Sequence, residues 1–323
     1  MSHPLLITGA AGFIGSCMVK ACQERGMDII SVDHLSHFDE RPEHAHIDFG
    51  TRVDRSRLFS WLEERKPSLK AIVHIGACTD TTQMDERYLT KMNFDYSTLI
   101  WLYASQNSIP LVYASSAATY GAGEWGYDDN EDLIPKLKPL NPYGWSKQRF
   151  DLWALDQEKK GVHPPTWSGF KFFNVYGFGE RHKQDMASVV LKAYDQILKS
   201  GSVRLFKSHK EGIADGDQKR DFVYVEDVVN VLQFALERPI ERGIYNLGTG
   251  KARSFLDLVR AVFRAIDQEE SIHFMDTPLA LRNQYQYFTE AIMEQLGSQG
   301  YTKPFASLEE GVLQYVQALR RKS

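Results

Sequence analysis

The fold of this chain is decided by the stretch Leu5-Leu6-Ile7-Thr8-Gly9-Ala10-Ala11-Gly12-Phe13-Ile14-Gly15. An apolar strand runs into three glycines at the spacing GxxGxxG, and an amphipathic helix is expected over 13–25. In such a turn the first glycine permits a tight bend, the second lets the backbone approach a pyrophosphate, and the third lets helix and strand pack closely. Gly9, Gly12 and Gly15 are therefore predicted to bind a dinucleotide.

Short apolar runs alternate with amphipathic stretches in the way that is typical of parallel βαβ units. The expected strands are 4–8, 28–32, 70–75, 110–115 and 169–174. A later segment is expected to return to the same sheet as a strand over 222–225, a helix over 227–237 and a strand over 244–247. A further amphipathic helix is expected over 253–266.

The fold class predicted from this pattern is α/β, with a Rossmann-type doubly wound parallel sheet and a smaller, interleaved α/β substrate lobe. Residues 1–177 and 222–250 are assigned to the dinucleotide-binding domain. Residues 178–221 and 251–323 are assigned to the substrate lobe. We expect the two lobes to be interleaved in sequence, because we find no clean linker between two halves of the chain.

Composition narrows the class of partner. A formal net charge of −4 gives no reason to expect nucleic acid or a membrane surface, both of which favour a basic field. The 3 cysteines form no CxxC pair, and no apolar run approaches the roughly 18–20 residues that span a bilayer. We therefore expect a cytoplasmic protein with reduced thiols and a small-molecule substrate.

An acidic residue ends the second expected strand. Asp33 follows the last glycine by about 18 residues, where a carboxylate can accept hydrogen bonds from an adenosine ribose. A role in cofactor binding is favoured over that of a plain turn residue because of this spacing.

A tyrosine and a lysine lie one helical turn apart in Asn141-Pro142-Tyr143-Gly144-Trp145-Ser146-Lys147. Asn141 is expected to cap the helix, with Pro142 in its first turn. Tyr143 and Lys147 then project from one face, where an ammonium can favour the phenolate and lower the pKa of the tyrosine. Tyr143 is thus a candidate general base.

Hydroxyl groups gather at the end of the strand over 110–115, within the segment Tyr113 to Gly121. This places them at the carboxyl edge, where doubly wound sheets bind ligands. Ser116 is the candidate to hydrogen-bond a reacting oxygen, whereas Ser115 and Thr119 are better explained as local backbone partners.

Together these motifs resemble the extended short-chain dehydrogenase/reductase family. More specific strings resemble the ADP-L-glycero-D-manno-heptose 6-epimerase family across nearly the whole chain. These strings are Tyr113 to Gly121, Phe172-Phe173-Asn174-Val175-Tyr176-Gly177, His182-Lys183, Met186-Ala187-Ser188, Lys219 to Val225, Gly248-Thr249-Gly250 and Tyr285-Gln286-Tyr287-Phe288-Thr289.

The resemblance implies inversion at carbon 6 of an ADP-glycero-manno-heptose destined for lipopolysaccharide core. It implies a transient ketone made with tightly held NADP, with NAD as the alternative, and a homo-oligomeric protein. Lys183 matches the second catalytic residue of the family, beside Tyr143, Lys147 and Ser116. A second acid/base group is reasonable because the ketone oxygen changes position when its other face is reduced.

The resemblance also assigns binding roles. Cofactor residues beyond the glycines are Phe13, Ile14, Asp33, His34, Ile75, Gly76, Ala77, Cys78, Thr79, Asn93, Lys147 and Val175. Substrate residues are Ser116, Asn174, Asp185, Lys192, Phe206, Arg220 and Tyr285.

Three departures from the family pattern bear on specificity. No lysine stands shortly after the second strand to hold a 2′-phosphate, and Arg41 is the first cation there. Asp185 and Lys192 replace a serine and a histidine of better-known members. The loop over 206–219 is longer and more charged.

Rival interpretations remain open. A 4,6-dehydratase is disfavoured because Ala117 and Ala118 stand where it needs acidic residues. A 4-epimerase of another nucleotide sugar and a non-catalytic dinucleotide-binding protein are the alternatives. A metal site in the histidine-rich segment 34–48 is disfavoured, because the segment is typical of a polar loop.

Overall fold

The computed structural model describes residues 3–238, 240–282 and 286–321. A seven-stranded sheet lies at the centre in the order β10-β6-β5-β4-β1-β2-β3, with every neighbouring pair parallel. Its strands are β1 Leu5–Thr8, β2 Ile29–Asp33, β3 Thr51–Asp54, β4 Ala71–His74, β5 Leu111–Ser116, β6 Trp167–Phe172 and β10 Gly243–Leu247. The predicted α/β fold class is confirmed.

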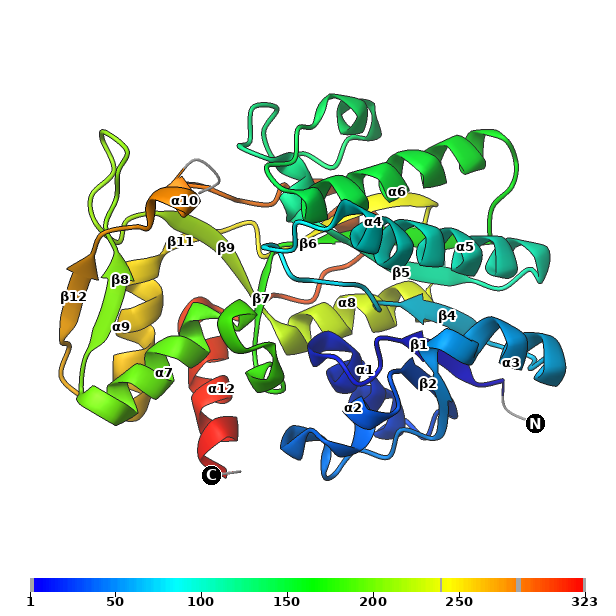
Figure 1. Cartoon of the computed structure of the whole chain (residues 1–323), viewed down its shortest axis with the longest axis horizontal. Coiled ribbons are helices and arrows are strands. Elements are labelled where there is room, and N and C mark those ends of the chain that lie inside the picture. The colour runs from blue at the N-terminus through cyan, green and yellow to red at the C-terminus, as the bar shows by residue number, and fades with distance from the viewer. Residues whose placement is uncertain (1–2, 239, 283–285, 322–323) are drawn as a thin grey trace.

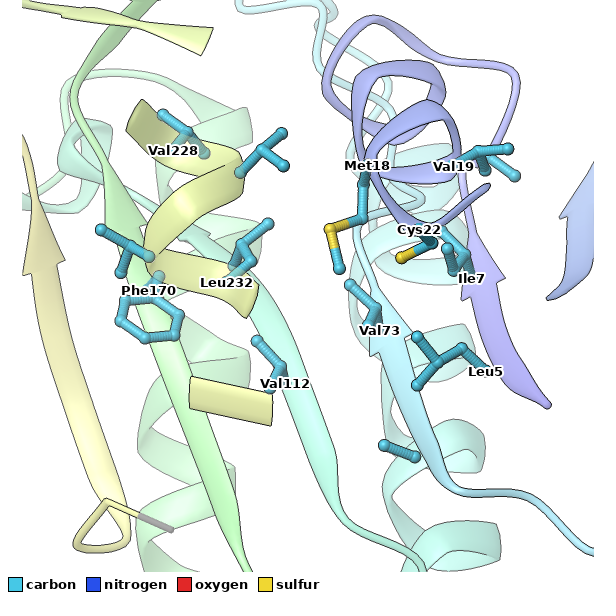
Figure 2. Close-up of a cluster of buried hydrophobic side chains, with 14 of the residues drawn as sticks. Leu5, Ile7, Met18, Val19, Cys22, Val73, Val112, Phe170, Val228 and Leu232 are labelled. Carbon is cyan, nitrogen blue, oxygen red and sulfur yellow. The ribbon is translucent and has the colours of Figure 1, made fainter. Parts of the chain in front are cut away.

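Helices cover both faces of this sheet (Figure 1). Side chains alternate along β1, so Leu5 and Ile7 join the core under α1 Phe13–Gln23 and α8 Val225–Glu237. Figure 2 shows this core, where Met18 and Leu232 face the sheet from the two helices.

Leu6 points to the opposite face of the sheet. There it meets a core supplied by α3 Leu58–Arg65, α5 Tyr96–Gln106 and α6 Pro142–Lys159. Because both faces are covered, the central strands β1 and β4 are fully buried and mostly apolar. The second face matters for function, because α6 carries the predicted Tyr-Lys pair.

One expectation was wrong. The strand over 222–225 does not return to the main sheet, because β9 Lys219–Tyr224 pairs with β7 Asn174–Tyr176 and β11 Ala252–Ser254 in a separate three-stranded sheet. The reason is that β9 is buried between two cores. Phe222 and Tyr224 pack into the core of the second lobe, whereas Val223 packs under the main sheet. The expected strand over 244–247 does join the main sheet, as β10.

The second core is built by three helices. These are α7 Val189–Ser200, α9 Phe255–Ile266 and α12 Leu308–Arg321, whose apolar faces pack together. A two-stranded parallel sheet of β8 Val203–Phe206 and β12 Ile272–Met275 lies beside them. The division into two sequence-interleaved domains remains a prediction.

The remaining helical elements are short. They are α2 Ser36–Asp39, η1 Pro42–His44, η2 Arg55–Arg57, α4 Glu86–Leu89, η3 Thr90–Asp95, η4 Ala117–Tyr120, η5 Glu131–Lys136, η6 Arg181–Met186, α10 Leu279–Arg282 and α11 Glu294–Ser298. Within the described part of the chain, no helix combines the length and apolar character that a bilayer crossing requires.

The glycine turn is as tight as its sequence predicts. Gly9 has a φ of +68°, a conformation that favours glycine. A Cβ atom on Gly15 would lie 2.0 Å from the carbonyl oxygen of Gly9, and one on Gly9 would lie 2.7 Å from Gly76 Cα. The first and third glycines are therefore required by the packing of the backbone itself.

We expect Gly15→Ala to lower the free energy of unfolding by about 2 kcal/mol or more, because a methyl group cannot share space with a backbone carbonyl. Gly297→Ala in α11 is the matched control, since nothing lies within 4 Å of its added Cβ. Urea unfolding of both variants measures the difference. Equal stabilities would contradict the packing argument.

Candidate functional site

The carboxyl ends of the parallel strands open onto a cavity of about 420 Å³. It is lined by eleven of the predicted cofactor residues, namely Gly9, Gly12, Phe13, Ile14, Gly15, Asp33, Ile75, Gly76, Ala77, Cys78 and Thr79. We refer to it as the dinucleotide cavity. The N-terminus of α1 begins at its wall, where unpaired backbone N–H groups suit a phosphate.

The carboxylate of Asp33 is held firmly at this cavity. One oxygen accepts from Ala11 N at 3.1 Å, and the other accepts from His34 N at 2.8 Å and from His37 Nδ1 at 2.9 Å. These bonds fix the orientation of the carboxylate beside the end of β2, and its contact with a ribose stays a prediction.

Four predicted cofactor residues do not line this cavity: Lys147 and Val175 line the cavity described next, and His34 and Asn93 line neither. His34 is exposed, and its ring lies 3.0 Å from the hydroxyl of Ser36. Asn93 is buried in the π-helical turn η3 and bonds both the N–H and the carbonyl of Cys78. Asn93 therefore shapes the cavity wall from behind, and its direct contact with a cofactor remains a prediction.

Two arginines that the sequence analysis did not assign to the cofactor also line the dinucleotide cavity. Arg41 donates to the carbonyl oxygen of Ala11, beside the glycine turn. Arg55 follows the edge strand β3. That strand was missed because it is only four residues long and two of them, Thr51 and Arg52, are exposed.

A second cavity of about 430 Å³ adjoins the first, and both are lined by Phe13, Ile14, Ile75, Ala77, Thr79, Lys183 and Met186. We refer to it as the reaction cavity. The structure brings most of the predicted catalytic and substrate residues to it: Ser116, Tyr143, Lys147, Asn174, Lys183 and Asp185. Val175, predicted to bind cofactor, lies here as well.

Tyr143 lies in the first turn of α6, where Asn141 caps the helix as predicted by accepting from Gly144 N at 2.8 Å. Burial raises the pKa of Tyr143, while a hydrogen bond from the Ser116 hydroxyl lowers it. Desolvation is the largest cause of the shift, and Lys147 is not among the causes; its effect on the phenol beside a bound nicotinamide stays a prediction. Ser116 is the group that favours the phenolate in this structure.

Lys147 is itself perturbed by burial. Its ammonium donates to the carbonyl oxygen of Ala114 at 2.9 Å, at the end of β5. Desolvation lowers the pKa of Lys147 to about 8, although the Asp151 carboxylate one turn further along α6 opposes this shift. Burial therefore brings the pKa of Lys147 well below the usual value for a lysine.

Lys183 lies on η6, between the two cavities, with its ammonium 5.7 Å from the centre of the Phe13 ring. Burial lowers its pKa, and the nearby Glu180 carboxylate opposes the change. Glu180 also anchors this loop, because it accepts from Ser188 N at 2.7 Å and from Ser188 Oγ at 2.6 Å. Lys183 is thus a desolvated, well-positioned acid/base candidate.

The remaining predicted substrate residues extend away from the reaction cavity. Lys192 and Phe206 line a third cavity of about 270 Å³, which shares Val189 with the reaction cavity. Arg220 is buried on β9, with its guanidinium 5.6 Å from the centre of the Phe255 ring. Tyr285 lies outside the described residues.

The histidine-rich segment makes local contacts. His37 bonds Asp33, and His44 Nδ1 lies 3.1 Å from the carbonyl oxygen of His37. Over residues 3–238, 240–282 and 286–321, no three His, Cys, Asp or Glu side chains gather as a metal site.

A glycine turn follows the first strand of the parallel sheet, and a tyrosine and a lysine one helical turn apart line the neighbouring cavity. This is the arrangement of a short-chain dehydrogenase/reductase. The model of the NAD dependent epimerase/dehydratase family matches residues 5–248, and the chain belongs to that family.

Two curated relatives carry one name. An ADP-L-glycero-D-manno-heptose-6-epimerase from Fusobacterium nucleatum is 45% identical, with 97% of each chain covered. Its namesake from Nitratidesulfovibrio vulgaris is 44% identical, with 97% of this chain and 96% of the relative covered. The likeness therefore extends through both lobes.

Solved structures are similar as well. The ADP-L-glycero-D-manno-heptose-6-epimerase of Helicobacter pylori superposes with a TM-score of 0.80 at 25% identity, covering 99% of this chain and 96% of that one. A UDP-N-acetylglucosamine 4-epimerase from Methanobrevibacter ruminantium gives a TM-score of 0.82 at 20% identity, with 100% of both chains covered, which shows the shared fold alone.

The titrations of Tyr143 and Lys147 predict how kcat/KM depends on pH. The phenolate of Tyr143 increases as the pH rises, whereas the ammonium of Lys147 is lost above about pH 8. We expect kcat/KM to rise with pH and to level off near pH 8, below the pKa of the buried tyrosine. In Lys147→Met, kcat/KM should be far lower but should continue to rise beyond pH 8. A wild-type profile that still rises past pH 9 would contradict the role of Lys147.

Proposed function

We propose that this protein inverts carbon 6 of an ADP-glycero-manno-heptose by transient oxidation to a ketone and re-reduction, in the supply of heptose for lipopolysaccharide core. The names of the relatives at 44–45% identity, aligned over 97% of the chain, support this substrate. A 4-epimerase of another nucleotide sugar is the alternative with the same chemistry.

The observation that carries the proposal is the presence of two acid/base groups in one cavity, supplied by separate elements. Tyr143 comes from α6 and Lys183 from η6, and both line the reaction cavity. An inversion through a planar ketone releases a proton from the hydroxyl in one orientation and returns it in another. Two groups in different positions suit that task better than one.

The dinucleotide cavity fits a nicotinamide dinucleotide. The Cβ positions of Gly9 and Gly15 are taken up by backbone, so these two positions would present main chain to a pyrophosphate at the start of α1. When bound there, the nicotinamide would accept the hydrogen of carbon 6 as hydride and return it. The shared lining of the two cavities would keep substrate and cofactor in contact.

The residues of the reaction cavity would manage the protons. Tyr143 would take the proton of the 6-hydroxyl, with Ser116 donating to the phenolic oxygen and so favouring the phenolate. Lys183, whose pKa is lowered by burial, would supply a proton to the ketone oxygen in its other orientation.

The third cavity suits the nucleotide part of the substrate. Phe206 and Phe255 supply aromatic surface to it, and Lys192 and Arg204 supply positive charge. We therefore place the adenosine diphosphate between this cavity and Arg220, whose planar fork suits a phosphate. Lys192 is held at its mouth by donating to the carbonyl oxygen of Asp185 at 2.6 Å.

Elimination of water is disfavoured by the lining next to Ser116. Ala117 and Ala118 face the reaction cavity, where a dehydratase needs a carboxyl group to protonate the leaving hydroxyl. The short helix η4, which follows Ser116, has the sequence Ala117-Ala118-Thr119-Tyr120 and so supplies no carboxyl group.

For the cofactor we propose NADP. Arg41 and Arg55 line the cavity together with Asp33 and His37, at the end of β2 where the adenosine ribose would lie. These two guanidinium groups would take the place of the family lysine that this chain lacks. A homo-oligomeric assembly, as the family resemblance implies, remains a prediction.

The reaction is tested by incubating purified protein with ADP-glycero-manno-heptose of either configuration at carbon 6 and identifying products by NMR. We expect interconversion of the two epimers, and in D2O the hydrogen on carbon 6 should not exchange with solvent. Inversion only of a UDP-sugar at carbon 4 would establish the alternative. Absence of turnover with any of these substrates would indicate a non-catalytic dinucleotide-binding protein.

Tyr143→Phe removes the proposed base and should lower kcat by about 10²–10⁴-fold, because general acid/base catalysis contributes that much. Tyr103→Phe is the matched control, since Tyr103 lies on α5 and lines neither the dinucleotide cavity nor the reaction cavity. Dinucleotide affinity should stay within about twofold in both variants. Comparable kcat values for the two variants would refute the role of Tyr143.

Arg55→Ala should weaken NADP binding by about tenfold or more and leave NAD binding almost unchanged, because a charged hydrogen bond contributes about 1.5–3 kcal/mol. Arg57→Ala is its control, since Arg57 is exposed in the same turn and does not line the cavity. Calorimetric titration with each dinucleotide measures the effect. An equal loss of NADP and NAD affinity in Arg55→Ala would contradict recognition of the 2′-phosphate.

A further inference from the structure

A fully buried ion pair lies directly beneath the reaction cavity. Lys171 on β6 donates to the Asp151 carboxylate on α6 at 2.7 Å, and both side chains have 0% exposure. Removing two charges from water costs free energy that their attraction can fail to recover, so stabilising the fold is not a sufficient explanation for this pair. Its contacts point instead to the segment that carries Ser116.

The ammonium of Lys171 is fully engaged. Besides Asp151 it donates to Thr119 Oγ1 at 2.8 Å, and it lies 5.3 Å from the centre of the Tyr120 ring. The Asp151 carboxylate accepts in addition from Ser115 Oγ at 2.7 Å. The pair thus joins α6 and β6 to the end of β5 and to η4.

Thr119 transmits this anchoring to Ser116. A threonine hydroxyl has a single proton to donate, and its oxygen accepts here from Lys171. The proton is therefore directed to the carbonyl oxygen of Ser116, at 2.8 Å. This bond closes the turn from Ser116 to Thr119 from a direction that is fixed by β6.

The closed turn orients the hydroxyl of Ser116. Ala118 N donates to Ser116 Oγ at 3.1 Å, which holds that oxygen in place, and the same hydroxyl is hydrogen-bonded to Tyr143 with its second lone pair and its proton still available. Rotation of the turn would alter both bonds at once. The hydrogen bond to Tyr143 therefore depends on where Thr119 is held.

We propose that Thr119, held by the buried Lys171–Asp151 pair, is a positioning residue that sets the Ser116 hydroxyl against Tyr143. This inference rests on the proposed function, in which Ser116 assists the base. Thr119 does not act on the substrate itself. Its effect is on the geometry of the reacting groups, for which displacements of about 1 Å can cost up to 10²-fold in rate.

Thr119→Val preserves the shape of the side chain and removes both hydrogen bonds. We expect kcat to fall about tenfold, with KM and NADP affinity within about twofold of wild type, because the binding cavities are unchanged. Thr119→Ser keeps the hydroxyl and should restore most of kcat. A kcat for Thr119→Val equal to that of wild type would overturn the proposal.

A second variant removes the anchor and keeps the threonine. Lys171→Met with Asp151→Asn eliminates both buried charges together, so that neither is left unpaired. Because Asp151 also raises the pKa of Lys147, each enzyme is compared at the plateau of its own pH profile. The variant should show the same selective loss of kcat there, and unchanged kcat would overturn the proposal. Failure of both this variant and Thr119→Val to fold and bind NADP would also overturn it, because the network would then maintain the fold and not the site. An inactive wild type would instead refute the proposed function.

Discussion

The close approach of the glycine turn to its neighbouring strands is the constraint on which the other features depend. Gly9 and Gly15 leave no room for a Cβ atom, so β1, α1 and β4 meet at backbone distance. The dinucleotide cavity lies beside this contact, at the carboxyl edge of the sheet. Phe13 and Ile14, at the start of α1, line both the dinucleotide cavity and the reaction cavity. Cofactor and substrate would therefore meet at one edge of one sheet.

Burial shifts the pKa values of the ionisable groups that line the reaction cavity. Desolvation disfavours the charged forms, so it raises the pKa of Tyr143 and lowers the pKa values of Lys147 and Lys183. The two lysines are brought toward pH values at which they can exchange protons. Individual hydrogen bonds then counteract the cost of burying the phenolate, and the bond from Ser116 is the main one on Tyr143. A polar network of this kind requires rigid support, which the surrounding parallel strands provide.

Much of the site was predictable because its residues lie at fixed distances along single elements. The glycine turn, the cap at Asn141 and the hydroxyls that end β5 follow from local backbone geometry. The prediction for the strand over 222–225 failed because contacts between distant segments decide which sheet it joins. The strand β9 lies outside the main sheet because its two faces are buried in different cores. His34 is exposed and does not line the dinucleotide cavity, and its contact with a cofactor stays a prediction.

The sequence by itself determined the Rossmann class, the dinucleotide turn and the Tyr-Lys pair, because each depends on spacing within a few residues. Only the tertiary structure decided which side chains join them. Arg55, which follows an edge strand, and the Lys171–Asp151 pair come from segments far apart in the chain, and Lys183 on η6 was expected only from the family resemblance. Their encounter depends on how helices and sheets pack, and the burial that lowers the pKa of Lys183 exists only after that packing is complete.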